Sequence, residues 1–155
     1  IQIAPLRNLP VIKDLVADMD PFFAKWVKAE GVFHATQTRD DEIARVNPVD
    51  QRRVAADAAI ECINCAVCYA SCDTVRGNPD YLGPAALNRA WTLINDVKDG
   101  KRASILDAVS QEGGCHNCHS QGRCAKFCPY ELSPITSIAG LKRETMKSFF
   151  GRRSC

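Results

Sequence analysis

Eight of the nine cysteines fall in two short runs, and thiolates at such close spacing can bind metal. The first run spaces its members three, three and four residues apart, at Cys62, Cys65, Cys68 and Cys72. This pattern is typical of chains that bind two iron–sulfur clusters, because three of its thiolates hold one cluster and the fourth turns away to ligate the other. The first run therefore predicts a second cluster.

The second run supplies that cluster, with one change from the pattern. Cys118, Cys124 and Cys128 keep the spacing, whereas Gln121 stands where the second cysteine would be. Exchange of the fourth cysteines gives the first cluster four thiolates, from Cys62, Cys65, Cys68 and Cys128. It gives the second cluster three, from Cys72, Cys118 and Cys124. Four thiolates predict [4Fe-4S] and three predict [3Fe-4S], because the Gln121 amide is not a soft ligand for a fourth iron.

Three other uses of these cysteines stay open on sequence alone. A zinc site could take Cys62 and Cys65 with Cys115 and Cys118, but it would leave four cysteines without a role. Disulfides would require an oxidising compartment and would stabilise little at such short spacing. The segment from Cys115 to His119 matches a c-type haem attachment motif, which would take Cys118 away from the second cluster.

Three further residues have weaker signals. Cys115 could replace Cys118 or add a fourth ligand to the second cluster, which would then be [4Fe-4S]. Cys155 is expected to be a free thiol, and His34 is expected to be solvated in a polar loop.

Composition describes a globular chain without a nucleic-acid footprint. Its 155 residues are 46% hydrophobic and favour one domain, and the net charge of +2 gives no basic surface of the kind that nucleic acids require. The basic segment from Lys142 to Cys155 is expected to be a solvated face, with an acidic partner or anionic headgroups as the alternative. Charged residues interrupt every stretch that could span a bilayer. Ile1 is expected to be a processed or truncated end.

The elements before the first cysteine run are expected to be an extended start, helical material up to residue 30, a loop and a further helix. Helical spacing of apolar residues is present at Val11, Ile12, Leu15 and Val16. Asp20 and Pro21 predict the start of a helix, residues 31–49 predict a loop, and Asp50 predicts the start of another helix that leads to Cys62.

Three more helices are expected after the first run. One begins at Gly83 and Pro84, stops at Asp99 and Gly100, and has an apolar face of Ala86, Leu87, Ala90, Leu93, Ile94 and Val97. A shorter one passes through Ile105, Leu106 and Val109. The last runs from Ser133 and Pro134 to Gly151, with apolar positions that include Ile135, Ile138, Leu141, Met146 and Phe149. Because no segment alternates convincingly with period two beyond the first few residues, the predicted fold class is all-α.

These runs and their flanking residues resemble the iron–sulfur subunit of succinate dehydrogenase and fumarate reductase (respiratory complex II). The similar stretches are residues 10–16, 62–72, 78–79 with 83–85, and 118–129, so the resemblance covers nearly the whole chain. It implies an α-helical ferredoxin-like domain with two clusters over residues 50–155. Residues 1–49 would be a linker and helices that follow a missing [2Fe-2S] domain, whose last strand would end near Ile3.

The resemblance also implies a function. A chain of this kind relays electrons through its [4Fe-4S] and [3Fe-4S] clusters between a flavoprotein subunit and a membrane quinone, and has no catalytic substrate site of its own. Its partners would be the flavoprotein subunit, a [2Fe-2S] domain or subunit, and membrane-anchor subunits, with the quinone at the interface. It would lie peripherally on the cytoplasmic face of the bacterial inner membrane or the matrix face of the mitochondrial inner membrane.

Three residues are implied to lie near the quinone, namely Asp73, His119 and Gln121. Two positions depart from the family pattern: Asp73 replaces the usual proline, and Gly77 stands where ubiquinone-type members carry tryptophan. A buried carboxylate at Asp73 would need a proton or a cationic partner. We therefore expect Asp73 either to titrate and relay protons to the quinone together with His119, or to face a basic group of a partner.

The alternative family is heterodisulfide-reductase-like subunits and the iron–sulfur subunits of glycerol-3-phosphate or glycolate oxidation. Those chains typically have four cysteines in the second run and two [4Fe-4S] clusters. Gln121 breaks that pattern here.

Overall fold

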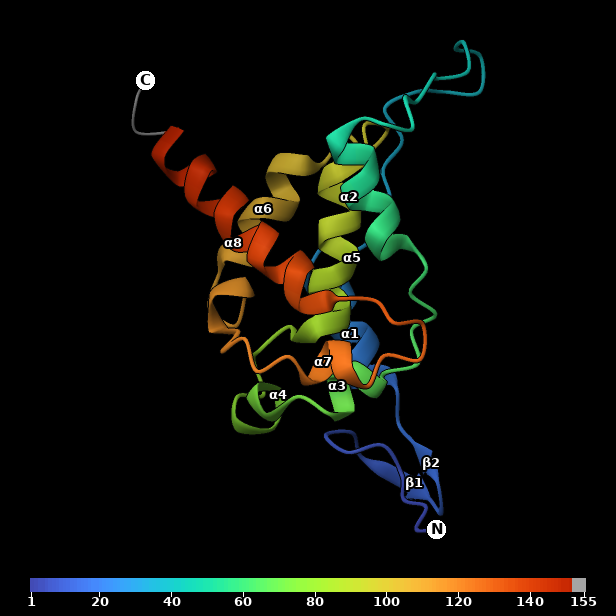
Figure 1. The fold of residues 1–155 in the computed structure, drawn as a ribbon, viewed down its shortest axis with the longest axis vertical. Coiled ribbons are helices and arrows are strands. Elements are labelled where there is room, and N and C mark those ends of the chain that lie inside the picture. The colour runs from blue at the N-terminus through green and yellow to red at the C-terminus, as the bar shows by residue number, and fades with distance from the viewer. Residues whose placement is uncertain (152–155) are drawn as a thin grey trace.

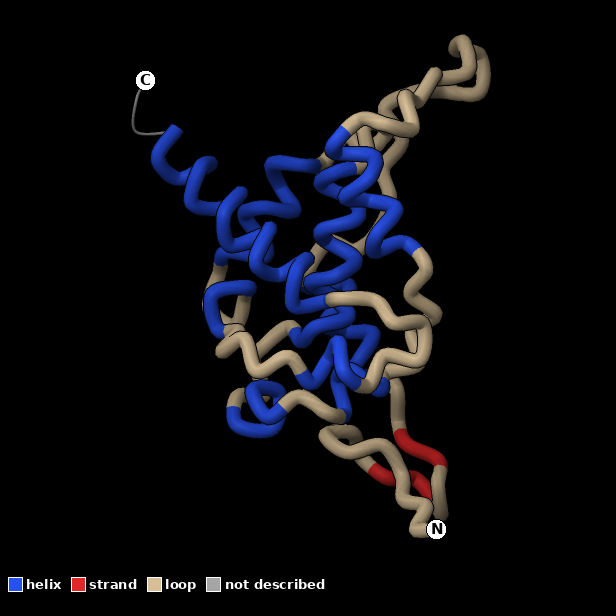
Figure 2. The backbone as a smooth tube through the Cα atoms, viewed as in Figure 1, coloured by secondary structure: helices blue, strands red, loops and turns tan. Residues whose placement is uncertain are grey.

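The computed structural model describes residues 1–151, which form a bundle of helices with a small β-hairpin at one end (Figures 1 and 2). The elements are β1 (Val11–Lys13), β2 (Val16–Ala17), α1 (Asp20–Lys28), α2 (Gln51–Ile60), α3 (Val67–Ala70), α4 (Asp73–Gly77), α5 (Gly83–Asn95), α6 (Arg102–Ser110), the 3₁₀ helix η1 (Cys115–Asn117), α7 (Arg123–Lys126) and α8 (Pro134–Gly151). The prediction of an all-α fold is confirmed.

Helix α5 is the centre of the core, and α1, α2, α3, α6 and α8 pack around it (Figure 1). Leu87, Ala90 and Ile94 on α5 are completely buried, as are Ile105 of α6 and Leu141 of α8. Their removal from water is the main source of stability, because apolar burial dominates the favourable free energy of folding. The predicted apolar positions therefore define the core at all but the ends of these helices.

Two helix starts follow directly from side-chain chemistry. The Asp50 carboxylate accepts hydrogen bonds from the backbone N–H groups of Arg52 (2.9 Å) and Arg53 (3.3 Å), which satisfies two free donors at the start of α2. Helix α1 begins at Asp20 with Pro21 in its first turn, where a missing N–H costs nothing. Residues 31–49 lack helices and contain only an isolated β-bridge, between Ala35 and Asp99, as expected for a loop.

The prediction of helical structure near residue 11 is wrong. Val11 to Ala17 form an antiparallel hairpin instead, with Asp14 in the left-handed region (φ 51°) at its turn. Four apolar residues of the hairpin are more than half exposed, namely Val11, Ile12, Leu15 and Val16. Their helical spacing therefore does not reflect a helix face that is buried in the core.

Two helices bury less of their predicted faces than expected. Helix α5 ends at Asn95 because the Asp96 carboxylate accepts the Lys98 N–H (2.9 Å) and turns the chain, so Val97 is exposed. Helix α8 is described as far as Gly151, and its last described turns extend beyond the core and leave Met146 and Phe149 about half exposed (Figure 1).

The turn before η1 requires glycine at two consecutive positions. Gly113 has φ +81°, and a Cβ on Gly114 would lie 2.0 Å from the Val109 carbonyl oxygen. Because backbone atoms cannot move aside as a side chain can, we expect Gly114→Ala to destabilise the protein by about 1–3 kcal/mol. The thermal unfolding midpoint should fall by several degrees, at about 2–4 °C per kcal/mol for a chain of this size.

The control for this prediction is Gly77→Ala, because nothing lies within 4 Å of a Cβ at Gly77. Far-UV circular dichroism melts of the two variants should therefore separate clearly. Equal midpoints would contradict the steric argument.

Candidate iron–sulfur cluster site

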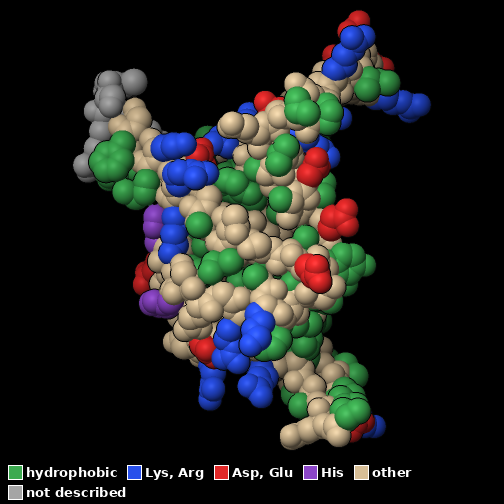
Figure 3. All heavy atoms as spheres, viewed as in Figure 1, with side chains coloured by type: hydrophobic (Ala, Val, Ile, Leu, Met, Phe, Trp, Pro, Cys, Tyr) green, Lys and Arg blue, Asp and Glu red, His purple; other side chains and the backbone are tan. Residues whose placement is uncertain are grey.

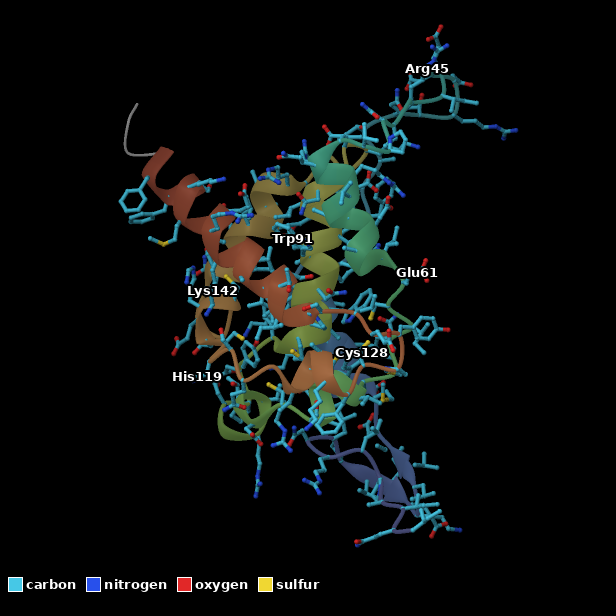
Figure 4. The ribbon with its side chains drawn as sticks, viewed as in Figure 1. Arg45, Glu61, Trp91, His119, Cys128 and Lys142 are labelled. Carbon is cyan, nitrogen blue, oxygen red and sulfur yellow. The ribbon has the colours of Figure 1, made fainter. Side chains whose placement is uncertain are left out.

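Seven of the eight cysteines from the two runs gather around two cavities near the start of α5. The first cavity is lined by Cys62, Cys65, Cys68 and Cys128, together with mostly apolar neighbours such as Ala66, Ala85 of α5 and Pro134 of α8. Cys128 lies on the loop between α7 and α8, beside the start of α5 (Figure 4). The structure thus places the last cysteine of the second run with the first three cysteines of the first run.

Left-handed residues wrap the first run around this cavity. Asn64 has φ 57° and Ala66 has φ 58°, and both lie between cysteines. Alternation of right- and left-handed residues turns successive N–H groups toward one side, and such nests occur at many iron–sulfur sites. Ala66 is buried, with 1% of its surface exposed, and adopts the left-handed conformation that residues other than glycine rarely adopt. This conformation costs about 1–2 kcal/mol. The loop is therefore held in a strained conformation by its surroundings.

The second cavity is lined by the other three cysteines of the two predicted sets, Cys72, Cys118 and Cys124. Cys72 directly precedes α4, and Cys124 lies in α7. The Ser120 N–H lies 3.4 Å from the Cys118 sulfur, toward which it donates. Gln121 and His119 also line this cavity.

Helix α8 fixes the loop that carries Cys118. The Lys142 ammonium donates a hydrogen bond to the Cys118 carbonyl oxygen (2.7 Å). Figure 4 shows Lys142 on α8 above His119 on this loop. Lys142 was predicted to be part of a solvated basic face; it is instead partly buried and positions the second run.

The N-terminal segment fixes the first run. The Asn8 side-chain amide donates toward three carbonyl oxygens, of Tyr69 (3.0 Å), Ala70 (3.2 Å) and Cys72 (3.1 Å). Phe22 of α1 packs edge-on against Tyr69, with ring centroids 5.6 Å apart. Residues from both sides of the predicted boundary at residue 49 therefore support the same site.

Burial opposes ionisation of these thiols. Desolvation, followed by the neighbouring thiols, raises the pKa of Cys68 strongly, and desolvation also raises the pKa of Cys62. Desolvation raises the pKa of Cys124 to about 11. These three thiols would thus stay protonated at neutral pH until a metal displaces the protons. Both cavities require a cationic partner for their thiolates, which fits iron.

Sequence reasoning missed Tyr81, which lines the second cavity with 1% of its surface exposed. Desolvation raises the pKa of its hydroxyl, and the Cys118 and Cys72 thiols and a hydrogen bond to Cys118 raise it further. The hydroxyl therefore keeps its proton beside Cys118. Its only sequence signal was its position just before Gly83 and Pro84.

Cys115 lies outside both cavities. It is completely buried, and its sulfur lies 3.9 Å from the Thr145 hydroxyl oxygen. His116 Nε2 lies 3.0 Å from the same oxygen. Cys115 is thus placed as a core residue under α8, and Cys155 lies outside the described residues.

Two of the rival uses of the cysteines, a zinc site and disulfides, do not match this arrangement. Zinc would need four sulfur atoms about 2.3 Å from one ion, but Cys62 and Cys65 line one cavity and Cys118 lines the other. In residues 1–151, no three Cys, His, Asp or Glu side chains converge on a single ion position. The eight described cysteines are all unpaired.

The residues expected near the quinone differ in their surroundings. His119 and Gln121 are exposed and line the second cavity. Asp73 is not buried: 49% of its side chain is exposed, and its carboxylate pairs with the Arg123 guanidinium at 2.9 Å. The structure therefore contradicts the premise of a buried Asp73, and the basic group beside it belongs to this chain and not to a partner. His34, expected to be solvated, is only partly buried, and its Nδ1 lies 2.9 Å from the Val32 carbonyl.

Comparison with known families supports the metal chemistry. Residues 61–133 match the model of a 4Fe-4S dicluster domain. This range contains all seven cysteines that line the two cavities. The chain therefore binds iron–sulfur clusters.

Relatives with known names are similar over most of the chain. Over 95% of its length, the chain is 31% identical to a succinate dehydrogenase iron–sulfur subunit of Coxiella burnetii. Over 92% of its length, it is 33% identical to the corresponding subunit of Paracoccus denitrificans. Over 91% of its length, it is 34% identical to a mitochondrial succinate dehydrogenase [ubiquinone] iron–sulfur subunit of rice. It spans 62%, 54% and 50% of these relatives, respectively.

A solved structure supports the fold. The chain matches one chain of the apo Sdh1 complex of Mycobacterium smegmatis with a TM-score of 0.74 and 21% identity, covering 95% of this chain and 62% of that one. This match confirms the predicted helical fold, whereas the predicted resemblance is confirmed by the named relatives. The chain is similar to succinate dehydrogenase iron–sulfur subunits over part of their length, and its residues 61–133 match the model of a 4Fe-4S dicluster domain.

Proposed function

We propose that this chain is the electron-transfer part of a succinate:quinone or fumarate reductase complex, with a [4Fe-4S] cluster in the first cavity and a [3Fe-4S] cluster in the second. The observation that carries the proposal is the separation of seven cysteines into a set of four and a set of three. Four thiolates suit a cubane, and three thiolates with Gln121 suit a cluster that lacks one iron.

The residues of this chain would hold, shield and tune the clusters, which supply one-electron redox chemistry when bound. Cys68 and Cys124 belong to different sets but lie close enough that the Cys124 thiolate would raise the pKa of Cys68. The two clusters would therefore be neighbours, as a relay requires. Apolar side chains exclude water, and the Ser120 N–H and Tyr81 hydroxyl lie where they can donate toward the sulfur of Cys118.

The proposed partners are a flavoprotein subunit, a [2Fe-2S] domain or subunit, and membrane-anchor subunits. His119 and Gln121 lie on the exposed loop at the second cavity, so we place the quinone beside them. None of the helices in the described part of the chain is long and apolar enough to cross a bilayer. We propose peripheral attachment through the anchor subunits, on the cytoplasmic face in bacteria or the matrix face in mitochondria.

Low-temperature EPR of anaerobically purified protein, before and after dithionite, tests the cluster assignment. We expect an oxidised-state signal that disappears on mild reduction, with about seven irons per chain by chemical analysis. An EPR-silent oxidised protein with about eight irons would instead favour the heterodisulfide-reductase-like alternative. Zinc without iron or sulfide would reject both.

A further inference from the structure

One ion pair connects the two segments that hold the second cavity. Asp73 is the first residue of α4 and directly follows Cys72, and Arg123 is the first residue of α7 and directly precedes Cys124. Their carboxylate and guanidinium lie 2.9 Å apart. Arg123 also lines the second cavity. Two opposite charges are thus fixed beside two of the three thiols.

The pair lies in a surface that is otherwise basic. Figure 3 shows Lys and Arg side chains gathered over the region of α4 and α7, which carry Arg76 and Lys126 besides Arg123. Lys142 brings a further ammonium to the Cys118 carbonyl. Without Asp73, the Arg123 charge would add to these. The Asp73 carboxylate therefore neutralises the charge of Arg123, which is the cation nearest to Cys124 in the sequence.

We propose that the Asp73–Arg123 ion pair sets the reduction potential of the cluster in the second cavity by cancelling its two charges against each other. This inference rests on the proposed function. Reduction adds one negative charge to a cluster, so a nearby cation favours the reduced form and a nearby anion disfavours it. With both present, the two effects oppose each other.

The two single variants should therefore shift the potential in opposite directions. Asp73→Asn leaves the guanidinium unbalanced and raises the potential, whereas Arg123→Gln leaves the carboxylate and lowers it. Each should change the ratio of reduced to oxidised cluster at a fixed ambient potential by roughly three- to tenfold, as expected for a partly screened charge. A tenfold change corresponds to 59 mV for a one-electron couple.

Three further results separate charge from structure. The double variant Asp73→Asn with Arg123→Gln should have a reduction potential close to that of the unmodified protein. Asp73→Glu and Arg123→Lys keep the charges and should leave it nearly unchanged. Because both side chains are almost half exposed, the single-variant shifts should shrink as salt concentration rises.

A matched control exists on α2. Arg53 and Asp57 form an ion pair with side-chain exposures of 32% and 46%, close to the 44% and 49% of Arg123 and Asp73. Neither lines the first or the second cavity. Arg53→Gln and Asp57→Asn should leave the second cluster's potential unchanged.

The experiment is an EPR-monitored redox titration of each variant, with iron and sulfide measured on the same samples. Opposite shifts that cancel in the double variant would establish the proposal. Loaded clusters with unchanged potentials, or shifts of the same sign in both single variants, would overturn it while leaving the proposed function intact. Absence of a second cluster from the unmodified protein would overturn both.

Discussion

Replacing Gln121 with cysteine is expected to convert the [3Fe-4S] cluster that we propose for the second cavity to [4Fe-4S]. Gln121 lines the second cavity with the three thiols of Cys72, Cys118 and Cys124. Its neighbours Ser120 and Gly122 both have positive φ, which curves the loop around this position. A thiolate there would give the fourth iron the soft ligand that an amide cannot provide.

The conversion has two independent signs. Iron content should rise from about seven to about eight per chain, and the oxidised-state EPR signal should vanish, because a cubane in its usual oxidised form is EPR-silent. Gln121→Ser is the control, since a hydroxyl is a poor ligand for iron and should leave both measurements unchanged. A Gln121→Cys protein that keeps seven irons and the same signal would show that this position does not face the missing corner.

Removing the Cys68 thiol is expected to abolish the first cluster, whereas removing the Cys115 thiol is expected to spare both. Cys68 lines the first cavity with three other cysteines, and its alanine variant would leave an iron without a protein ligand. Cys115 points toward Thr145 of α8 instead. Its alanine variant should lose only a small buried volume and a weak hydrogen bond, about 1–2 kcal/mol.

Iron and sulfide analysis with EPR checks this contrast. Cys68→Ala should fall from about seven irons to about three or fewer, and Cys115→Ala should keep about seven. The thermal midpoint of Cys115→Ala should drop modestly. If Cys115→Ala lost iron as Cys68→Ala does, Cys115 would be a ligand, and two [4Fe-4S] clusters would become the better assignment.

Local chemistry made several elements predictable. Asp50 caps α2 because its carboxylate reaches N–H groups two and three residues away, an interaction that any fold would allow. The helical spacing of Leu87, Ala90 and Ile94 predicted α5 because a buried helix needs one continuous apolar face. The same spacing at residues 11–16 predicted a helix where the structure has a hairpin, because periodicity carries no information on whether a segment reaches the core.

The sequence by itself determined that the cysteines would serve two clusters, since thiolates spaced three and four residues apart fix the local geometry of ligation. Only the tertiary structure decided what surrounds those thiols. Asn8, Tyr81 and Lys142 come from segments distant in the chain, and the partner of Asp73 lies 50 residues away at Arg123. Such contacts depend on how α5 and α8 pack around the cavities. Packing is a property of the whole fold, and spacing within one segment does not encode it.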